Sequence, residues 1–184
     1  MYIYTGIGSR ETPKDVLDLM IRMGHGFGGH GWILRSGGAD GADSAFEQGC
    51  DKVNGPKEIY IPWKGFNGNS SALYTVSAEA LAMASKIHPA WDKCSKGAKS
   101  LHARNMYQIL GYDLKTPTSC VICYTVAGKG SGGTGQAIRL ARHNDIPVFD
   151  IGLYYDANEQ PYDMGEHVLE HCREFLQTFI IKGK

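Results

Sequence analysis

Three glycine-rich turns, each lying between a strand-like run and a helical pattern, are the feature that most constrains the fold of this chain. The turns occupy residues 6–10, 36–43 and 128–136. Each follows a run of β-branched, aromatic or other apolar residues and precedes apolar residues at helical spacing. Strands that alternate with helices predict a parallel sheet with helices on both faces. We therefore expect an α/β fold, a Rossmann-like three-layer sandwich with a mainly parallel central sheet.

The length and the apolar content set the scale of this fold. A chain of 184 residues with 42% apolar residues can bury one core of ordinary size, so we expect one domain over residues 1–184. No stretch approaches the roughly 18 consecutive apolar residues of a membrane span, and the N-terminus lacks the pattern of a signal peptide. We expect a cytoplasmic protein with no membrane partner. The five cysteines are scattered, which favours free thiols.

The first and third turns carry groups that bind phosphate. Backbone amides, hydroxyls and a guanidinium follow the first strand, and the third turn adds flexible amides at the start of a helix. The third turn does not match the P-loop, and its glycine spacing is not that of the dinucleotide fingerprint. A typical kinase or dehydrogenase is therefore not expected. The candidate ligands in these two turns are Gly8, Ser9, Arg10, Gly132, Gly133, Thr134 and Gln136.

The second turn has a different chemistry, because acids begin the helix that follows it. Ser36, Gly37 and Gly38 leave room for the backbone to approach a ligand. Asp40 and Asp43 would repel a phosphate. They are suited to accepting hydrogen bonds from ribose hydroxyls or a base, or to capping the helix.

The charge is unevenly distributed along the chain. Residues 86–142 contain nine Lys and Arg against two Asp and Glu, although the whole chain has a formal net charge of zero. A basic segment beside a glycine-rich pocket suits an anionic partner, either a phosphorylated small molecule or a nucleic-acid backbone. The alternative is a solvated basic face that acidic neighbours balance in the fold.

Four motifs in order resemble those of the SLOG superfamily. They are Gly8-Ser9-Arg10, the run at 36–43, Leu-His-Ala-Arg-Asn at 101–105 and Gly-Gly-Thr at 132–134. The superfamily includes the DNA-processing protein DprA, the YspA/YpsA-like proteins and the LOG phosphoribohydrolases. The resemblance covers about residues 2–151 and looks closest to the small DprA-like proteins that phages encode. It implies a homodimer and a nucleotide-type pocket that also contains Arg104 and Asn105.

The resemblance does not carry over the residues that LOG enzymes use for catalysis. Arg104 matches their motif arginine, but Asn105 replaces the lysine that follows it. Arg139 stands where their catalytic glutamate belongs, and an arginine cannot act as a general base. Asp40, Asp43 and Glu11 are the acids that could take that role. We assign no catalytic residue and expect a binding protein rather than an enzyme.

Three functions follow from these patterns. The first is binding of a nucleotide or nucleotide-derived ligand, to sense or sequester a signal. The second is DprA-like binding of single-stranded DNA, and the third is nucleoside-monophosphate hydrolysis of the LOG type. A DNA-binding surface would combine basic side chains with two aromatic rings, namely Lys93, Lys96, Lys99, Arg104, Lys129, Arg139 and Arg142 with Trp91 and Tyr107.

Two pairs of metal-ligating residue types favour structural roles. Cys120 and Cys123 are three apart on a predicted strand and point to opposite faces, which predicts buried thiols. His167 and His171 share a helical face that we expect to be solvated. We therefore predict no metal ion and no cofactor. For His102 and for the aromatic pair Trp63 and Phe66, two roles stay open: contact with the ligand at the pocket, or packing within the fold.

Overall fold

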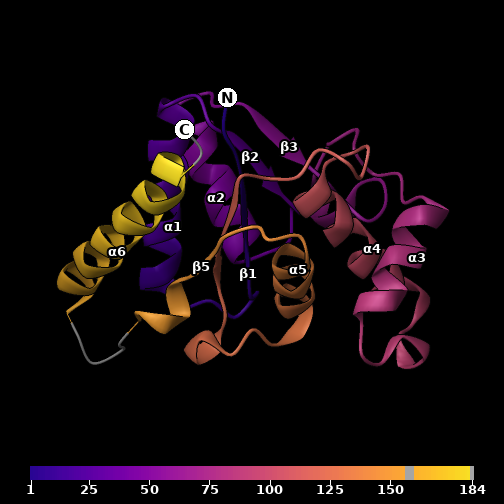
Figure 1. Ribbon diagram of the computed structural model, residues 1–184. Helices are drawn as coiled ribbons and strands as arrows, with labels where there is room; N and C mark the ends of the chain where they lie inside the picture. Colours follow the sequence, from indigo (N-terminus) through magenta and orange to yellow (C-terminus); the bar gives the residue numbers. More distant parts are fainter. Residues whose placement is uncertain (156–159, 183–184) are drawn as a thin grey trace.

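The computed structural model describes residues 1–155 and 160–182, and its central feature is a five-stranded sheet (Figure 1). The strand order is β3-β2-β1-β4-β5, and all four strand pairs are parallel. The predicted α/β three-layer sandwich is therefore confirmed. The strands are β1 (Ile3–Gly8), β2 (Ile33–Ser36), β3 (Lys57–Ile59), β4 (Cys120–Tyr124) and β5 (Val148–Asp150).

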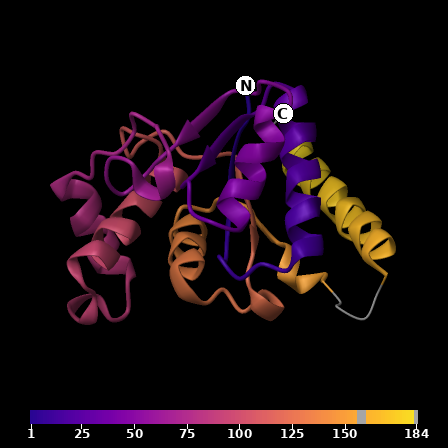
Figure 2. The ribbon, with the colours of Figure 1, turned by 180° about the vertical axis from the view of Figure 1, so that it is seen from behind.

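Helices cover both faces of the sheet (Figures 1 and 2). Buried side chains of α1, α2 and α6 share one apolar cluster, and those of α3, α4 and α5 share another. The helix α3 packs mainly against α4 and forms the outer end of its layer. The helices are α1 (Lys14–Gly29), α2 (Ala42–Asp51), α3 (Ala78–Ile87), α4 (Lys96–Leu110), α5 (Gly132–His143) and α6 (Pro161–Lys182).

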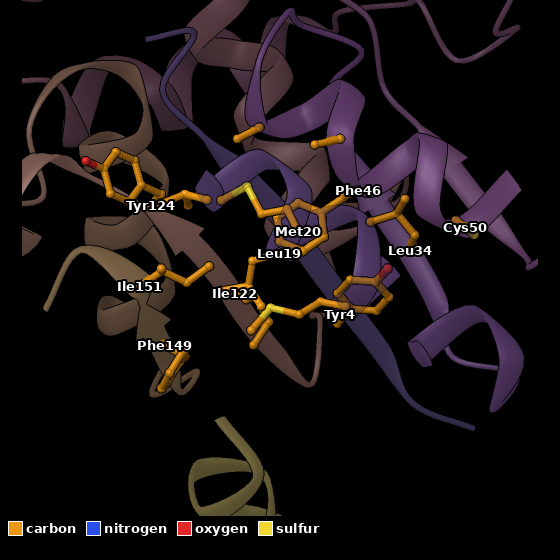
Figure 3. Close-up of a cluster of buried hydrophobic side chains, with 14 of the residues drawn as sticks. Tyr4, Leu19, Met20, Leu34, Phe46, Cys50, Ile122, Tyr124, Phe149 and Ile151 are labelled. Atoms are coloured by element: carbon orange, nitrogen blue, oxygen red, sulfur yellow. The ribbon is translucent and has the colours of Figure 1, made fainter. Parts of the chain in front are cut away.

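The strand β4 shows how the sheet separates the two clusters. Cys120 and Ile122 belong to the cluster under α1, α2 and α6, whereas Val121 and Cys123 belong to the opposite one. All four side chains are fully buried, as a central strand of a parallel sheet requires. The prediction that Cys120 and Cys123 are buried thiols on opposite faces is therefore confirmed. Figure 3 shows the first cluster, with Tyr4, Phe46 and Ile122 at its centre.

Glycines set the close approach of α1 and α2. A Cβ atom at Gly49 would lie 2.2 Å from the carbonyl oxygen of Ile21, and one at Gly24 would lie 2.5 Å from that of Phe46. No side chain fits between backbones at these distances. By contrast, Gly26 on the same helix α1 has open space around it.

The junction of β1 and β4 positions the candidate site. The chain runs from β1 outward to β2 and β3, then returns to the other side of β1 to form β4 and β5. The two strands pair from Tyr4 with Cys120 to Gly8 with Tyr124. At such a reversal the loops diverge and leave a crevice beyond the carboxyl ends of the strands.

Three further sequence predictions concern the surface. His167 is exposed as expected, while the ring of His171 lies against Tyr154 at 4.7 Å. Trp63 is half-exposed and packs edge-on against Phe66, which is buried in the core. Among the described residues, none of the helices combines the length and the hydropathy that a membrane crossing needs.

Candidate functional site

A cleft of about 560 Å³ opens at the carboxyl ends of β1 and β4. Its walls come from the turn after β1, the start of α2, one face of α4 and the N-terminus of α5. The fold therefore brings two of the four motifs to the cleft in full, Gly8–Arg10 and Gly132–Thr134. It also brings four of the five residues of the motif at 101–105, and Ala39 and Asp43 from the run at 36–43. The predicted site residues that line this cleft are Gly8, Ser9, Arg10, Asp43, Arg104, Asn105, Gly132, Gly133 and Thr134.

The other predicted site residues lie outside the cleft wall. The hydroxyl of Ser36 is buried and donates to the carbonyl oxygen of Gly6 at 2.7 Å, which ties β2 to β1. Gly37 is needed for space, since a Cβ atom there would overlap the guanidinium of Arg104. Gly38 has a positive φ of 60°, a conformation that favours glycine. Asp40 is exposed, and the residue that precedes α2 is Gly41, so neither aspartate of the turn is its N-cap.

A buried ion pair forms the floor of the cleft. The side chains of Arg104 and Asp43 are 6% and 5% exposed, and Nη1 of the arginine lies 3.5 Å from Oδ2 of the aspartate. The same Nη1 donates to the carbonyl oxygen of Tyr60 at 3.3 Å. Burial raises the pKa of Asp43, although Arg104 and the backbone amides of Ala39 and Gly8, among others, act in the opposite direction. The carboxylate of Asp43 thus interacts with Arg104 and with neighbouring backbone amides.

Two buried hydrogen-bond donors on the cleft lining lack an acceptor among the described residues. They are Nε of Arg104 and Nε2 of Gln108. A buried polar group without a partner costs about 1–3 kcal/mol, so proteins rarely leave one unless something else satisfies it. Both residues project from α4 into the cleft lining, one turn apart. A ligand that brought acceptor atoms to these two donors would satisfy them.

The glycine-rich loop before α5 is fixed by a buried carboxylate. Asp150, at the end of β5, accepts hydrogen bonds from the amide and the hydroxyl of Thr125 and from the amide of Gly152. The hydroxyl of Thr125 in turn accepts from the amide of Gly130 at 2.9 Å. The loop that follows presents Ser131 to the cleft together with the first turn of α5. Free amides at a helix N-terminus attract anions.

His102 is held by a network that reaches across to α5. Its Nδ1 lies 2.7 Å from Oε1 of Gln136, and the same oxygen accepts from Nδ2 of Asn105 at 3.3 Å. Gln136 is completely buried, so it supports the cleft residues rather than contacting a ligand. Burial lowers the pKa of His102, and the neighbouring His88 and Arg139 also favour the neutral ring. His102, His88 and Cys94 form the one group of potential metal ligands found among the described residues.

The basic side chains do not all share one surface. Arg104 is buried in the floor of the cleft, so it does not belong to an exposed basic face. Tyr107 is also buried: its ring stacks on Tyr60, and its hydroxyl donates to Ser77. Its predicted role as a stacking surface for bases is therefore wrong. Trp91 is partly exposed, and Nζ of Lys99 lies 5.4 Å from its ring centre.

Sequence reasoning missed several residues that shape the site. Gln108 lies four residues after Arg104 on α4, so helical spacing could have placed it on the same face. Thr125 follows β4 and Asp150 is the last residue of β5, and an acid at the carboxyl end of a buried strand was a usable signal. Of the residues that the sequence did suggest, Glu11 lines the cleft, whereas Arg139 is exposed and is not part of its lining.

Comparison with known proteins gives a likeness of fold. No protein-family model matches the chain, and no curated protein matches it either. Among solved structures, the chain is similar to DNA processing protein A from Helicobacter pylori, which was studied for its unique single-stranded DNA binding mode. The TM-score is 0.56 at 19% sequence identity, and the match covers 98% of this chain and 81% of that one. At this identity the likeness concerns the fold alone.

Proposed function

We propose that the cleft binds a nucleotide or a nucleotide-derived phosphorylated ligand. The observation that carries this proposal is the surplus of donors: Nε of Arg104 and Nε2 of Gln108 lack acceptors among the described residues, and both residues line the same cleft as the N-terminus of α5. Phosphate oxygens and base or ribose acceptors supply what such donors need. The volume of about 560 Å³ lies in the range of small-molecule sites.

Different parts of the cleft suit different chemical groups of the ligand. The amides and hydroxyls from Ser131 to Thr134 and the guanidinium of Arg10 suit the phosphate, because they combine a helix N-terminus with an exposed cation. Arg104 and Gln108 suit an uncharged acceptor deeper in the cleft, since Asp43 already neutralises the arginine. Glu11 provides an acceptor near the rim for a hydroxyl or an amino group.

Replacing Arg10 with glutamine tests the phosphate end of this assignment. We expect affinity for AMP, ATP or cyclic AMP to fall roughly tenfold, because one charge-assisted hydrogen bond is lost. Isothermal titration calorimetry measures the change. The matched control is Arg142→Gln, since Arg142 is also exposed but lies in the last turn of α5, outside the cleft. Absence of saturable binding by the unaltered protein to every nucleotide tried would refute the proposal.

Binding of single-stranded DNA is the second candidate, and the likeness in fold to DNA processing protein A favours it. Lys96 and Lys99 stand at the start of α4, next to cleft residues, with the partly exposed ring of Trp91 beside Lys99. A basic groove with an aromatic ring suits a flexible strand. This candidate differs from the first in its dependence on salt, because each neutralised phosphate releases counterions.

Neutralising Lys96 and Lys99 together as glutamines separates the two candidates. If single-stranded DNA binds at these lysines, the magnitude of the slope of log affinity against log salt should decrease by about 2 for an oligothymidylate, one for each lysine. Fluorescence anisotropy at several salt concentrations measures it. The matched double variant, Lys52→Gln with Lys115→Gln, removes two exposed lysines elsewhere and should leave the slope unchanged. If the protein binds small nucleotides independently of salt and does not bind the oligonucleotide, DNA binding is refuted and nucleotide binding remains.

Membership of the SLOG superfamily belongs to the same proposal. The order of its four motifs and the likeness in fold to a DNA-processing protein support it. The homodimer that the resemblance implies is proposed with it, as is the cytoplasmic location expected from the sequence. Hydrolysis of the LOG type has weaker support, because Arg139 occupies the glutamate position and Asp43 is paired with Arg104. We propose no reaction step.

A further inference from the structure

Three side chains with metal-binding atoms lie close together, and one of them, His102, also lines the cleft. His88 follows α3, Cys94 lies in the segment between α3 and α4, and His102 lies on α4. Their ligand atoms all lie within 4.8 Å of one another. The sulfur of Cys94 is 3.8 Å from Nδ1 and 3.9 Å from Nε2 of His88, and the two imidazole rings are 4.3 Å apart. None of the three is fully buried, so an ion can reach them.

These distances are close to those that a tetrahedral ion requires. Bonds of about 2.3 Å to sulfur and about 2.0–2.1 Å to nitrogen, at a tetrahedral angle, separate the two ligand atoms by about 3.6 Å. The observed 3.8 Å between Cys94 and His88 is only slightly longer. The remaining pairs of ligand atoms lie within 4.8 Å of one another, so the cluster would have to contract when an ion binds. Binding would exchange the 3.2 Å hydrogen bond that Nδ1 of His88 accepts from the amide of Ala90 for a bond to the metal.

The ring of His102 is held by a hydrogen bond at one of its two nitrogens. The amide of Gln136 is fixed from both ends, because its Nε2 donates to the carbonyl oxygen of Ala84 while its Oε1 faces Nδ1 of His102. An amide oxygen only accepts hydrogen bonds, so Nδ1 carries the proton and Nε2 keeps its lone pair. A second hydrogen bond of this kind holds most histidine ligands of metal sites in proteins. Gln136 therefore acts as a positioning residue for this cluster.

The chemistry of the three atoms selects the metal. A thiolate and two imidazoles suit Zn²⁺ and related borderline ions, and the group contains no carboxylate of the kind that Mg²⁺ or Ca²⁺ requires. We propose that His88, Cys94 and His102 bind a zinc-class ion, with the fourth position open to water. Because His102 also lines the cleft, that fourth position lies at the edge of the nucleotide site. The ion would join the end of α3, the connecting segment and α4, and reach α5 through Gln136.

Cobalt spectroscopy tests the site directly, because a cysteine ligand leaves a specific signal. Reduced, metal-free protein titrated with Co²⁺ should gain a thiolate-to-cobalt charge-transfer band and intense visible bands of four-coordinate cobalt, saturating at one ion per chain. Zinc should remove these bands by displacement. In Cys94→Ser the charge-transfer band should vanish and affinity should fall at least 100-fold. His88→Asn should weaken binding to a similar degree while the protein stays folded by circular dichroism.

The histidine pair on α6 is the matched control. His167 and His171 lie one helical turn apart, with ring centres 4.4 Å apart, and can bind cobalt weakly without sulfur. His167→Asn should therefore keep the charge-transfer band and the tight site. Cobalt binding without a thiolate band, or a band that persists in Cys94→Ser, would overturn the proposal. Failure of nucleotide binding would not affect it, since the readout involves the metal alone.

Discussion

Replacing Arg104 with methionine is expected to lower the free energy of unfolding by about 3–5 kcal/mol and to abolish measurable nucleotide binding. The stability loss arises because Asp43 would stay buried without its cationic partner, and would have to keep an unpaired charge or take up a proton. The binding loss arises because the unpartnered Nε of Arg104 is one of the donors that the ligand would satisfy. Urea denaturation and calorimetric titration measure the two effects separately.

A second substitution tells these two roles apart. When Asp43→Asn is combined with Arg104→Met, no buried charge is left alone, so most of the lost stability should return. Nucleotide binding should remain absent, because the donor is still missing. If the double variant binds nucleotide like the unaltered protein, Arg104 serves the fold alone. If Arg104→Met by itself leaves stability unchanged, the ion pair does not have the structural role assigned to it.

The second large effect is expected at the crossing of α1 and α2. Gly49→Ala should cost about 3 kcal/mol, because its Cβ atom would meet the carbonyl oxygen of Ile21 at 2.2 Å and the helices would have to separate. The matched control is Gly26→Ala on α1, where the Cβ atom meets nothing within 4 Å. That change should raise stability by about 0.5–1 kcal/mol, because alanine favours the helix.

Urea denaturation of both variants gives the comparison under the same conditions. Both substitutions add a methyl group to a helical glycine. Opposite signs of the change in the free energy of unfolding would therefore show the effect of the room available for that methyl group. Equal behaviour of Gly49→Ala and Gly26→Ala would show that the two helices adapt to the extra atom, and would contradict the close contact.

The fold could be predicted because its main signals are local. Each strand end that carries a glycine-rich turn is visible in the sequence, and the apolar residues of β4 are continuous, as a central parallel strand requires. The same signals placed Gly8, Arg10 and Gly132 at one edge of the sheet, and the structure brings all three to the cleft. The prediction of Arg104 as a site residue rested on the motif at 101–105 rather than on helical spacing.

Features that depend on packing between distant elements could not be predicted in this way. Gln108 matters because α4 packs with that face toward the cleft, and Asp150 matters because β5 ends beside Thr125. Tyr107 was misplaced because an aromatic ring in a basic segment gives no sign of which side of its helix is buried. His88, Cys94 and His102 follow no familiar zinc spacing, so only the turn between α3 and α4 reveals their proximity.

The pairing of β1 with β4 has a consequence for the chain during translation. Ile3 and Ser119, which are hydrogen-bonded at this junction, are 116 residues apart. At about 5–20 residues per second, a ribosome needs roughly 6–23 seconds to travel between them. Throughout that interval the inner edge of β1 has no strand beside it, which makes the nascent chain a target for chaperones and for wrong pairing. The rate of synthesis thus decides how long the future centre of the sheet is left open.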